Sequence, residues 1–211
     1  HAKPFSLPRQ KRALLALEWS VGFRPAGSVW VLLLALRGFS LVEIGLAEGV
    51  FHVVSLCCEL PSGLMADLLG RKRTLMTSQL MFLLSALLMA GAAELGGVCL
   101  ALAVSAAGYN LQSGTREAVT YESMLQAGRE TDYLRFSSLQ NAVYRFSDGG
   151  AMLLAGATVQ LGWRIAYLMD AAVAAVGLGA ALALAEPETG RTGKRPPSFP
   201  AALAWVFREA S

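Results

Sequence analysis

Six long stretches of the chain are almost continuously apolar, and short segments with charged or turn residues separate them. The stretches cover residues 13–36, 41–66, 74–93, 97–118, 138–159 and 165–185. A helix needs about 20 mainly apolar residues to cross the hydrocarbon core of a bilayer, and each stretch is that long. The pattern therefore predicts an all-α membrane protein with six transmembrane helices.

The composition agrees with a membrane protein and argues against several other classes. Hydrophobic residues make up 55% of the 211 residues and charged residues 16%, whereas soluble domains have about 45–50% and about 25%. Three cysteines are too few for a disulfide-rich secreted fold. The chain lacks the G-x-S-x-G, H-E-x-x-H and P-loop motifs. We expect no enzyme, cofactor or metal ion, and a membrane enzyme without a familiar motif stays open as an alternative.

Lysine and arginine are distributed unequally between the two sides of the expected membrane. Thirteen of them fall in residues 1–12, 67–73, 119–137 and 186–211, whereas only Arg37 and Arg164 fall in the segments on the other side. Cytoplasmic loops carry the excess of these residues. We therefore expect a multi-pass protein of the cell (plasma or inner) membrane with both ends in the cytoplasm. Bases that lie at the bilayer surface contact anionic lipid, so we expect no nucleic-acid partner.

Four of the six stretches carry polar residues at helical spacing, which predicts four polar helix faces. These residues are Ser20, Arg24 and Ser28; Glu48, His52, Ser55 and Glu59; Ser105, Tyr109, Gln112 and Arg116, with Asn110 and Glu117 beside them; and Asn141, Arg145 and Asp148. The stretches 74–93 and 165–185 have no such stripe across their middles.

Charged residues inside a membrane cost about 2.5–3.5 kcal/mol each at the centre, so they usually serve a function. We expect the four striped helices to line a water-filled pathway and the two plain helices to lie outside them, facing lipid. The alternative is that the polar groups only hold the helices together through hydrogen bonds. In that case Arg145 and Asp148, three residues apart, would simply neutralise each other.

The segment between the second and third stretches carries a sequence motif. Residues 63–73 read GLMADLLGRKR, residues 59–63 read ELPSG, and residues 113–118 read SGTREA, followed by YES at 121–123. In this order they resemble the signature loop and flanking motifs of the major facilitator superfamily, in its drug-efflux and related branches. Leu68 departs from the arginine common there. Asn110 stands near the place of an arginine frequent in drug antiporters, and Ser147-Asp148-Gly149-Gly150 lacks the proline of their fifth-helix motif.

The resemblance implies a protein of twelve spans in two halves, each an inverted repeat of three helices. The chain would be the N-terminal half, with repeats at 13–93 and 97–185. Residues 1–12 would be a cytoplasmic segment and residues 186–211 the start of the central linker. Its partner would be a C-terminal six-helix half, although a half-transporter that dimerises stays open. The resemblance also implies a gate that locks the outward-facing state, formed by Glu59, Gly63, Asp67, Gly70, Arg71, Lys72, Arg73, Glu117 and Glu122.

The geometry of a tight hairpin predicts a structural role for several residues of the loop. A seven-residue hairpin must turn sharply, so Gly70 is expected to adopt positive φ. Gly63 would let another backbone approach closely. Asp67 could cap the start of a helix. The bases at 71–73 could pair with Glu117 or Glu122.

The function that these features favour is secondary active transport of a small solute by alternating access, with proton-coupled export preferred from the resemblance. We expect the substrate to contact Arg24, Tyr109, Asn110, Gln112 and Arg145. Burial raises the pKa of a carboxyl group and a nearby arginine lowers it. Asp148 beside Arg145, and Glu48 with no base in reach on its own helix, are the proton-coupling candidates, and Glu48→Gln or Asp148→Asn should abolish proton-driven flux. A sensor or assembly module that does not transport is the alternative from a different class.

Overall fold

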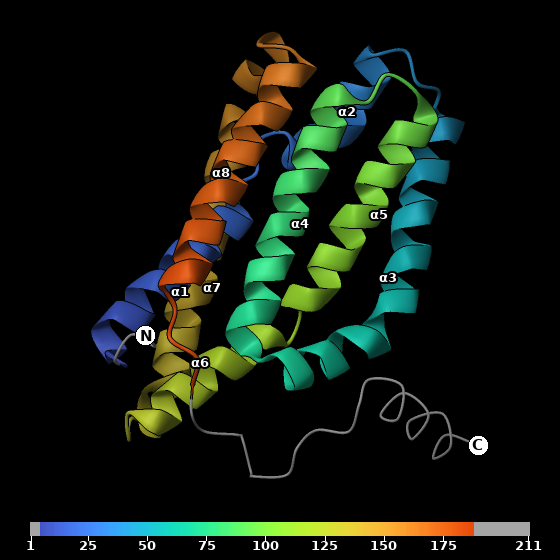
Figure 1. Ribbon diagram of the computed structural model, residues 1–211. Coiled ribbons are helices and arrows are strands. Elements are labelled where there is room, and N and C mark those ends of the chain that lie inside the picture. The colour runs from blue at the N-terminus through green and yellow to red at the C-terminus, as the bar shows by residue number, and fades with distance from the viewer. Residues whose placement is uncertain (1–4, 188–211) are drawn as a thin grey trace, which may run out of the picture.

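The computed structural model describes residues 5–187, apart from the side chains of Leu60 and Leu64, and this part of the chain is helical throughout (Figure 1). Its elements are α1 (Leu7–Gly22), the 3-10 turn η1 (Gly27–Val29), α2 (Trp30–Leu36), α3 (Leu41–Leu69), α4 (Arg71–Gly91), α5 (Leu95–Gln112), α6 (Thr115–Gln126), the 3-10 turn η2 (Glu130–Asp132), α7 (Tyr133–Gln160) and α8 (Trp163–Ala183).

The long helices form a row in which each packs mainly on the next. The order along the row is α3, α5, α4, α8, α1 and α7, and α2 returns to touch α3. Residues 5–12, the connection at Gly70, α6 and the C-terminal end of α8 lie at one end of the bundle along the helix axes, here called the terminal end (Figure 1). The connections at Arg37, Glu94 and Gly162 lie at the other, here called the opposite end. Helices α4 and α8 are therefore in the middle of the row.

Five helical segments within residues 5–187 are long and apolar enough to cross a membrane. They are Leu7–Leu36, Leu41–Glu59, Arg71–Gly91, Leu95–Gln126 and Trp163–Ala183. The sixth stretch expected from the sequence lies in α7, which has 28 residues but carries Arg145 and Asp148 and is not among them. The prediction of an all-α membrane fold is confirmed, whereas the number of six spans stays a prediction.

Two of the expected spans are interrupted, and one helix runs on further than expected. Residues 23–26, which include Pro25, separate α1 from η1, and Gly114 with φ +70° separates α5 from α6. Helix α3 continues through Pro61 to Leu69, and its last part turns to run across the terminal end (Figure 1). Proline removes a helical hydrogen bond and permits such a bend. The expected seven-residue hairpin is therefore wrong, since Gly70 alone separates α3 from α4.

The buried apolar residues form two clusters, one toward each end of the bundle. At the opposite end, Leu33, Leu34, Ile44 and Val98 join α2, α3 and α5. At the terminal end, Leu14, Leu17, Leu75, Val119 and Met124 join α1, α4 and α6. Between the two clusters lie buried polar residues, which we call the polar layer and which comprises Glu18, Ser20, Gln79, Gln112 and Asp170.

The expectation that the plain stretches 74–93 and 165–185 lie outside the striped helices is wrong, because α4 and α8 lie in the middle of the row and both bury polar groups. Helix α4 buries Thr74, Ser78, Gln79 and Ser85, and α8 buries Asp170. In the sequence these polar residues stand singly or in pairs among apolar residues, so the buried polar face of each helix was not evident. Each helix also exposes a row of large apolar residues, as lipid contact requires. These rows are Leu80, Leu84 and Leu87 on α4, and Ile165, Leu168, Val176 and Leu182 on α8.

Candidate functional site

A largely buried ion pair between Glu18 and Arg116 joins α1 to α6. Glu18 on α1 accepts hydrogen bonds from Arg116 Nη1 at 2.5 Å and from Gln140 Nε2 on α7 at 3.3 Å. The Glu18 side chain is 8% exposed and that of Arg116 27%. Glu117 and Asn141 line a polar cleft next to this pair. Three separate helices thus meet at one carboxylate.

Amide side chains connect the middle of the row. Gln79 Nε2 on α4 donates to Gln112 Oε1 on α5 at 3.0 Å, and Asn110 Nδ2 donates to Ser55 Oγ on α3 at 2.8 Å. Both Gln112 and Asn110 are buried. Their amide groups therefore bond to neighbouring helices in this structure.

The break in the first span is held by Asp170, which is almost completely buried on α8. Its Oδ1 and Oδ2 atoms accept the backbone N–H groups of Ala26 and Gly27, each at 3.0 Å. Breaking a helix inside a membrane leaves backbone donors without partners, and these must be satisfied within the protein. Arg24 Nε lies 4.0 Å from Asp170 Oδ2, and its guanidinium lies 5.1 Å from the centre of the Phe82 ring.

The other predicted site residues are more exposed. Glu48 and His52 lie on the outer surface of α3, with His52 Nε2 3.9 Å from Glu48 Oε1, so the expectation that Glu48 has no base in reach on its own helix is wrong. Tyr109 is exposed beside Phe51.

On α7 the alternative in which Arg145 and Asp148 neutralise each other is not found. Arg145 is exposed and its guanidinium lies over the Tyr144 ring, and the structure has no ion pair between Arg145 and Asp148. Nor do the polar residues of 97–118 share one face, because the break at Gly114 assigns Arg116 to α6. Of the expected substrate contacts, Arg24 lines a small cleft between α1, α4 and α8, and the substrate role of all five residues stays a prediction.

At the terminal end the motif residues surround the start of α4. Arg71 lies 3.0 Å from Asp67 and 3.3 Å from Glu122 on α6, so of the two expected partners Glu117 and Glu122 it is Glu122 that pairs with the basic triplet. Glu117 is exposed and lines the Glu18 cleft instead. Glu59 and Arg73 are exposed, and Lys72 is half-buried.

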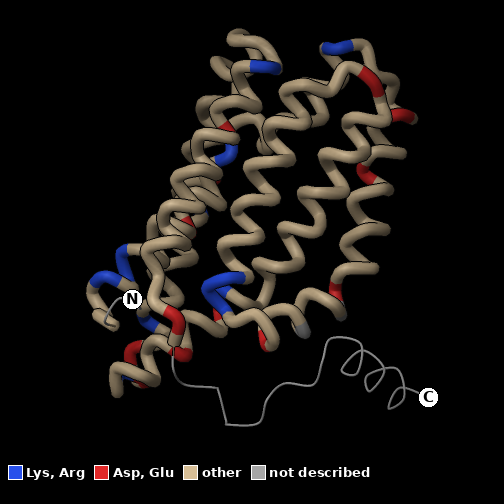
Figure 2. The backbone as a smooth tube through the Cα atoms, viewed as in Figure 1, with Lys and Arg blue, Asp and Glu red and all other residues tan. Residues whose placement is uncertain are grey.

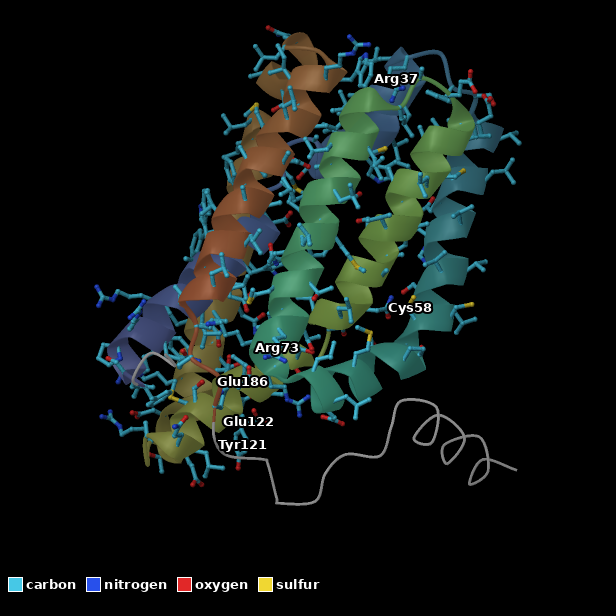
Figure 3. The ribbon with its side chains drawn as sticks, in the orientation of Figure 1. Arg37, Cys58, Arg73, Tyr121, Glu122 and Glu186 are labelled. Carbon is cyan, nitrogen blue, oxygen red and sulfur yellow. The ribbon has the colours of Figure 1, made fainter. Side chains whose placement is uncertain are left out.

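The start of α4 is capped by a residue that the sequence did not suggest. Glu186, which follows α8, accepts the backbone N–H groups of Arg71 at 2.6 Å and Lys72 at 2.9 Å. Figure 3 shows Arg73, Glu122 and Glu186 gathered at this end. A carboxylate at a helix N-terminus stabilises the free donors and the helix dipole. The expectation that Asp67 caps a helix is therefore corrected, since Asp67 pairs with Arg71 and Glu186 provides the cap.

At the opposite end Arg37 joins three connections. It donates a hydrogen bond to the carbonyl oxygen of Ala92, where α4 ends, and its guanidinium lies 4.0 Å from the centre of the Trp163 ring. Figure 3 labels Arg37 at this end, far from Glu186. A cation near a helix C-terminus and over a tryptophan face is stabilising in both respects.

Gly70 and Gly63 give a matched test of the loop. Gly70 has φ +93°, as expected, and a Cβ there would lie 2.6 Å from Glu186 Oε1, whereas a Cβ at Gly63 would meet nothing within 4 Å. Within the described residues, the expected close backbone approach at Gly63 is not found. We expect Gly70→Ala to lower the unfolding free energy by about 1–3 kcal/mol because it combines strain with displacement of the cap. The melting temperature of the purified protein measures this.

Gly63→Ala is the control, because it adds a good helix former to α3 where there is room. We expect its melting temperature to equal or exceed that of the wild type. Equal melting temperatures for Gly70→Ala and the wild type would mean that the turn does not require glycine.

The sequence matches a known family over almost its whole length. The family model described as Major Facilitator Superfamily matches residues 14–208. The chain belongs to the major facilitator superfamily. Members of this superfamily are transporters, so the chain is a transporter of the major facilitator type, and its apolar helices make it a multi-pass membrane protein. A search of curated proteins gave no match.

Family membership gives the terminal-end cluster a definite place in the molecule. The major facilitator signature loop is the segment that contains Asp67, Gly70 and Arg71, and here it is tied to α6 by Glu122 and to the end of α8 by Glu186. The loop thus holds three separate segments of this major facilitator chain together.

Proposed function

We propose that this chain belongs to a proton-coupled secondary transporter that exports a small solute across the cell (plasma or inner) membrane by alternating access. Export rests on the resemblance of its motifs to the efflux branches. We also propose that the chain works with a second six-helix half. The large exposed apolar residues of α7, such as Phe146 at 84% and Leu153 at 88%, need either such a half or lipid to cover them.

The distribution of basic residues supports a cytoplasmic position for the terminal end. Lysine and arginine gather there around the N-terminus and the start of α4, whereas the opposite end carries Arg37 and Arg164 among the described residues (Figure 2). The excess of these residues marks the cytoplasmic side of membrane proteins. The signature loop and its Glu186 cap would then face the cytoplasm.

The observation that carries the proposal of proton coupling is the Glu18–Arg116 pair. A coupling carboxylate must change its partner when it gains a proton, and protonation of Glu18 removes the charge that holds Arg116. Arg116 is in the first turn of α6, which follows the break at Gly114. Protonation would therefore release α6 from α1 at a place where the backbone can already turn.

Glu48 and Asp148 stay within the proposal as the two candidates from the sequence. The Glu48 side chain is 55% exposed, and Asp148 is half-buried without an ion pair to Arg145. Neither holds a second helix by an ion pair among the described residues. Glu18 is the stronger candidate because its charge holds α6 and its hydrogen bond holds α7.

The test uses proteoliposomes that contain the full-length transporter and a panel of labelled acids, amines and sugars. We expect an imposed pH gradient to drive at least one of them, and Glu18→Gln to reduce this uphill transport at least about tenfold. Exchange of the same solute at equal pH on both sides should continue, which shows that the variant is folded. Glu94→Gln, an exposed position between α4 and α5, is the control and should transport as the wild type does.

Two results would overturn parts of the proposal. Transport that does not respond to any pH gradient would exclude proton coupling. Gradient-driven transport that survives in Glu18→Gln but is lost in Glu48→Gln or Asp148→Asn would move the proton site to that residue.

A further inference from the structure

The break in the first span opens a small cleft between α1, α4 and α8. Val21 lines it from α1, Arg24 from the break after α1, Phe82 from α4, and Asp170 and Ala174 from α8. We propose that this cleft binds the carboxylate of an organic acid through Arg24, so that the transported solute is an anion with an apolar body. This inference rests on the proposed transport function and names the class of solute.

Asp170 cannot serve as a site for a cation. Each of its two oxygen atoms already accepts a backbone N–H group at 3.0 Å, and its side chain is 2% exposed. A positively charged ligand would have to displace these bonds and expose the broken backbone. The acidic member of the cleft is therefore committed to the fold.

Arg24, in contrast, keeps its donors. Its side chain is 35% exposed, its distance of 4.0 Å from Asp170 is too long for a hydrogen bond, and its guanidinium donates none to residues 5–187. A guanidinium carries five N–H groups. Contact with the Phe82 ring constrains the guanidinium while its nitrogen atoms stay accessible.

The remaining polar groups of the cleft are engaged elsewhere. The Gln79 amide nitrogen donates to Gln112, and the Ser20 hydroxyl donates to the carbonyl oxygen of Leu17 at 2.7 Å. The free hydrogen-bonding capacity is thus mainly that of the Arg24 donors, which require an acceptor. A carboxylate suits them best because its two oxygen atoms match the guanidinium in a bidentate pair.

The depth of the cleft within the membrane favours a solute over a lipid headgroup as its ligand. Asp170 is the eighth residue of α8 counted from the opposite end, which is about 10 Å along the helix at 1.5 Å per residue. Lipid phosphates lie outside the hydrocarbon core, which is about 30 Å thick. The enclosed space of the cleft is about 20 Å³, room for about one small polar group, so only the carboxylate would enter it and the apolar body of the acid would lie at its open side against Val21, Phe82 and Ala174.

The experiment measures binding of labelled benzoate, and of labelled benzamide as its uncharged analogue, to the full-length protein in neutral detergent. We expect benzoate but not benzamide to bind, and Arg24→Gln to weaken benzoate binding at least about tenfold. Arg24→Lys should retain part of the affinity, because it keeps the charge without the bidentate geometry. Arg135→Gln, which removes an exposed arginine of α7, is the control and should bind as the wild type does.

A second measurement does not depend on Arg24 variants being stable. In a background with Cys57, Cys58 and Cys99 replaced by alanine, Val21→Cys should react with a thiol reagent more slowly in benzoate than in benzamide. Benzoate binding that is equal in Arg24→Gln, or equal protection by benzamide, would overturn the carboxylate site. The same measurements in vesicles of neutral lipid and in vesicles rich in anionic lipid distinguish a solute carboxylate from a lipid headgroup. If anionic lipid prevents benzoate binding, the site belongs to lipid headgroups.

The two proposals fail separately. If benzoate binds through Arg24 but no solute responds to a pH gradient, the site stands and proton-coupled transport falls. If a gradient drives other solutes while benzoate does not bind, transport stands and the assignment of the solute class falls.

Discussion

Replacing Asp170 by alanine is expected to lower the free energy of unfolding by about 2–6 kcal/mol, because it leaves two buried backbone N–H groups without acceptors at about 1–3 kcal/mol each. The carboxylate satisfies two backbone N–H groups where the first span breaks and lies near Arg24. Its loss leaves these donors inside the membrane without acceptors, where water cannot replace them. The melting temperature of the purified protein and the amount recovered from membranes measure the effect.

Asp148→Ala is the matched control for this change. Asp148 is a half-buried aspartate on α7 without an ion pair to Arg145, so we expect its loss to cost less than about 1 kcal/mol. Asp170→Asn should fall between the two, because one amide oxygen remains to accept while the amide nitrogen faces a donor. If Asp170→Ala melts with the wild type, the break is not held by this carboxylate.

Gly22→Ala is expected to lower the unfolding free energy by about 1–3 kcal/mol because it overpacks the contact between α1 and α7. A Cβ at this position would lie 2.5 Å from the carbonyl oxygen of Tyr144 and 3.0 Å from the Cβ of Ser147. The first atom belongs to the backbone of a long helix, so no side-chain rotation can relieve the clash. The two helices must separate, which also disturbs the Glu18–Gln140 hydrogen bond between them.

Gly149→Ala separates this steric effect from helix propensity. Gly149 is on α7, and a Cβ there would meet nothing within 4 Å, so we expect unchanged stability or a gain of up to about 1 kcal/mol. Melting curves of the two variants in one detergent make the comparison. A Gly22→Ala protein as stable as Gly149→Ala would show that α1 and α7 can move apart without cost.

The sequence predicted features that depend on neighbouring positions. Long apolar stretches indicated the membrane helices, the motif at 63–73 indicated the family that the comparison confirms, and Gly70 was expected to adopt positive φ. The pairing of the basic triplet with Glu117 or Glu122 was expected from the side on which these residues lie, and the structure selects Glu122. The apolar stretches and the turn at Gly70 are features that a single helix or turn determines.

The contacts that the sequence missed join segments far apart in the chain. Glu18 and Arg116 are 98 residues apart, and Glu186 and Arg71 are 115 apart. Helical spacing describes one face of one helix but does not identify the helix that packs against it. Asp170 was overlooked for the same reason, because its partners are backbone groups freed by a break that hydropathy does not reveal.

Helix α7 has a consequence for how this protein enters the membrane. It is not among the five segments that are long and apolar enough to cross a membrane, and it carries Arg145 and Asp148, so we expect it to insert less readily than they do. Its partner helix α1 is synthesised earlier. Glu18 of α1 accepts a hydrogen bond from Gln140 of α7, and Gly22 of α1 packs closely against the backbone of Tyr144. We therefore expect the order of synthesis to matter for folding, with α1 already in the bilayer to hold α7 there.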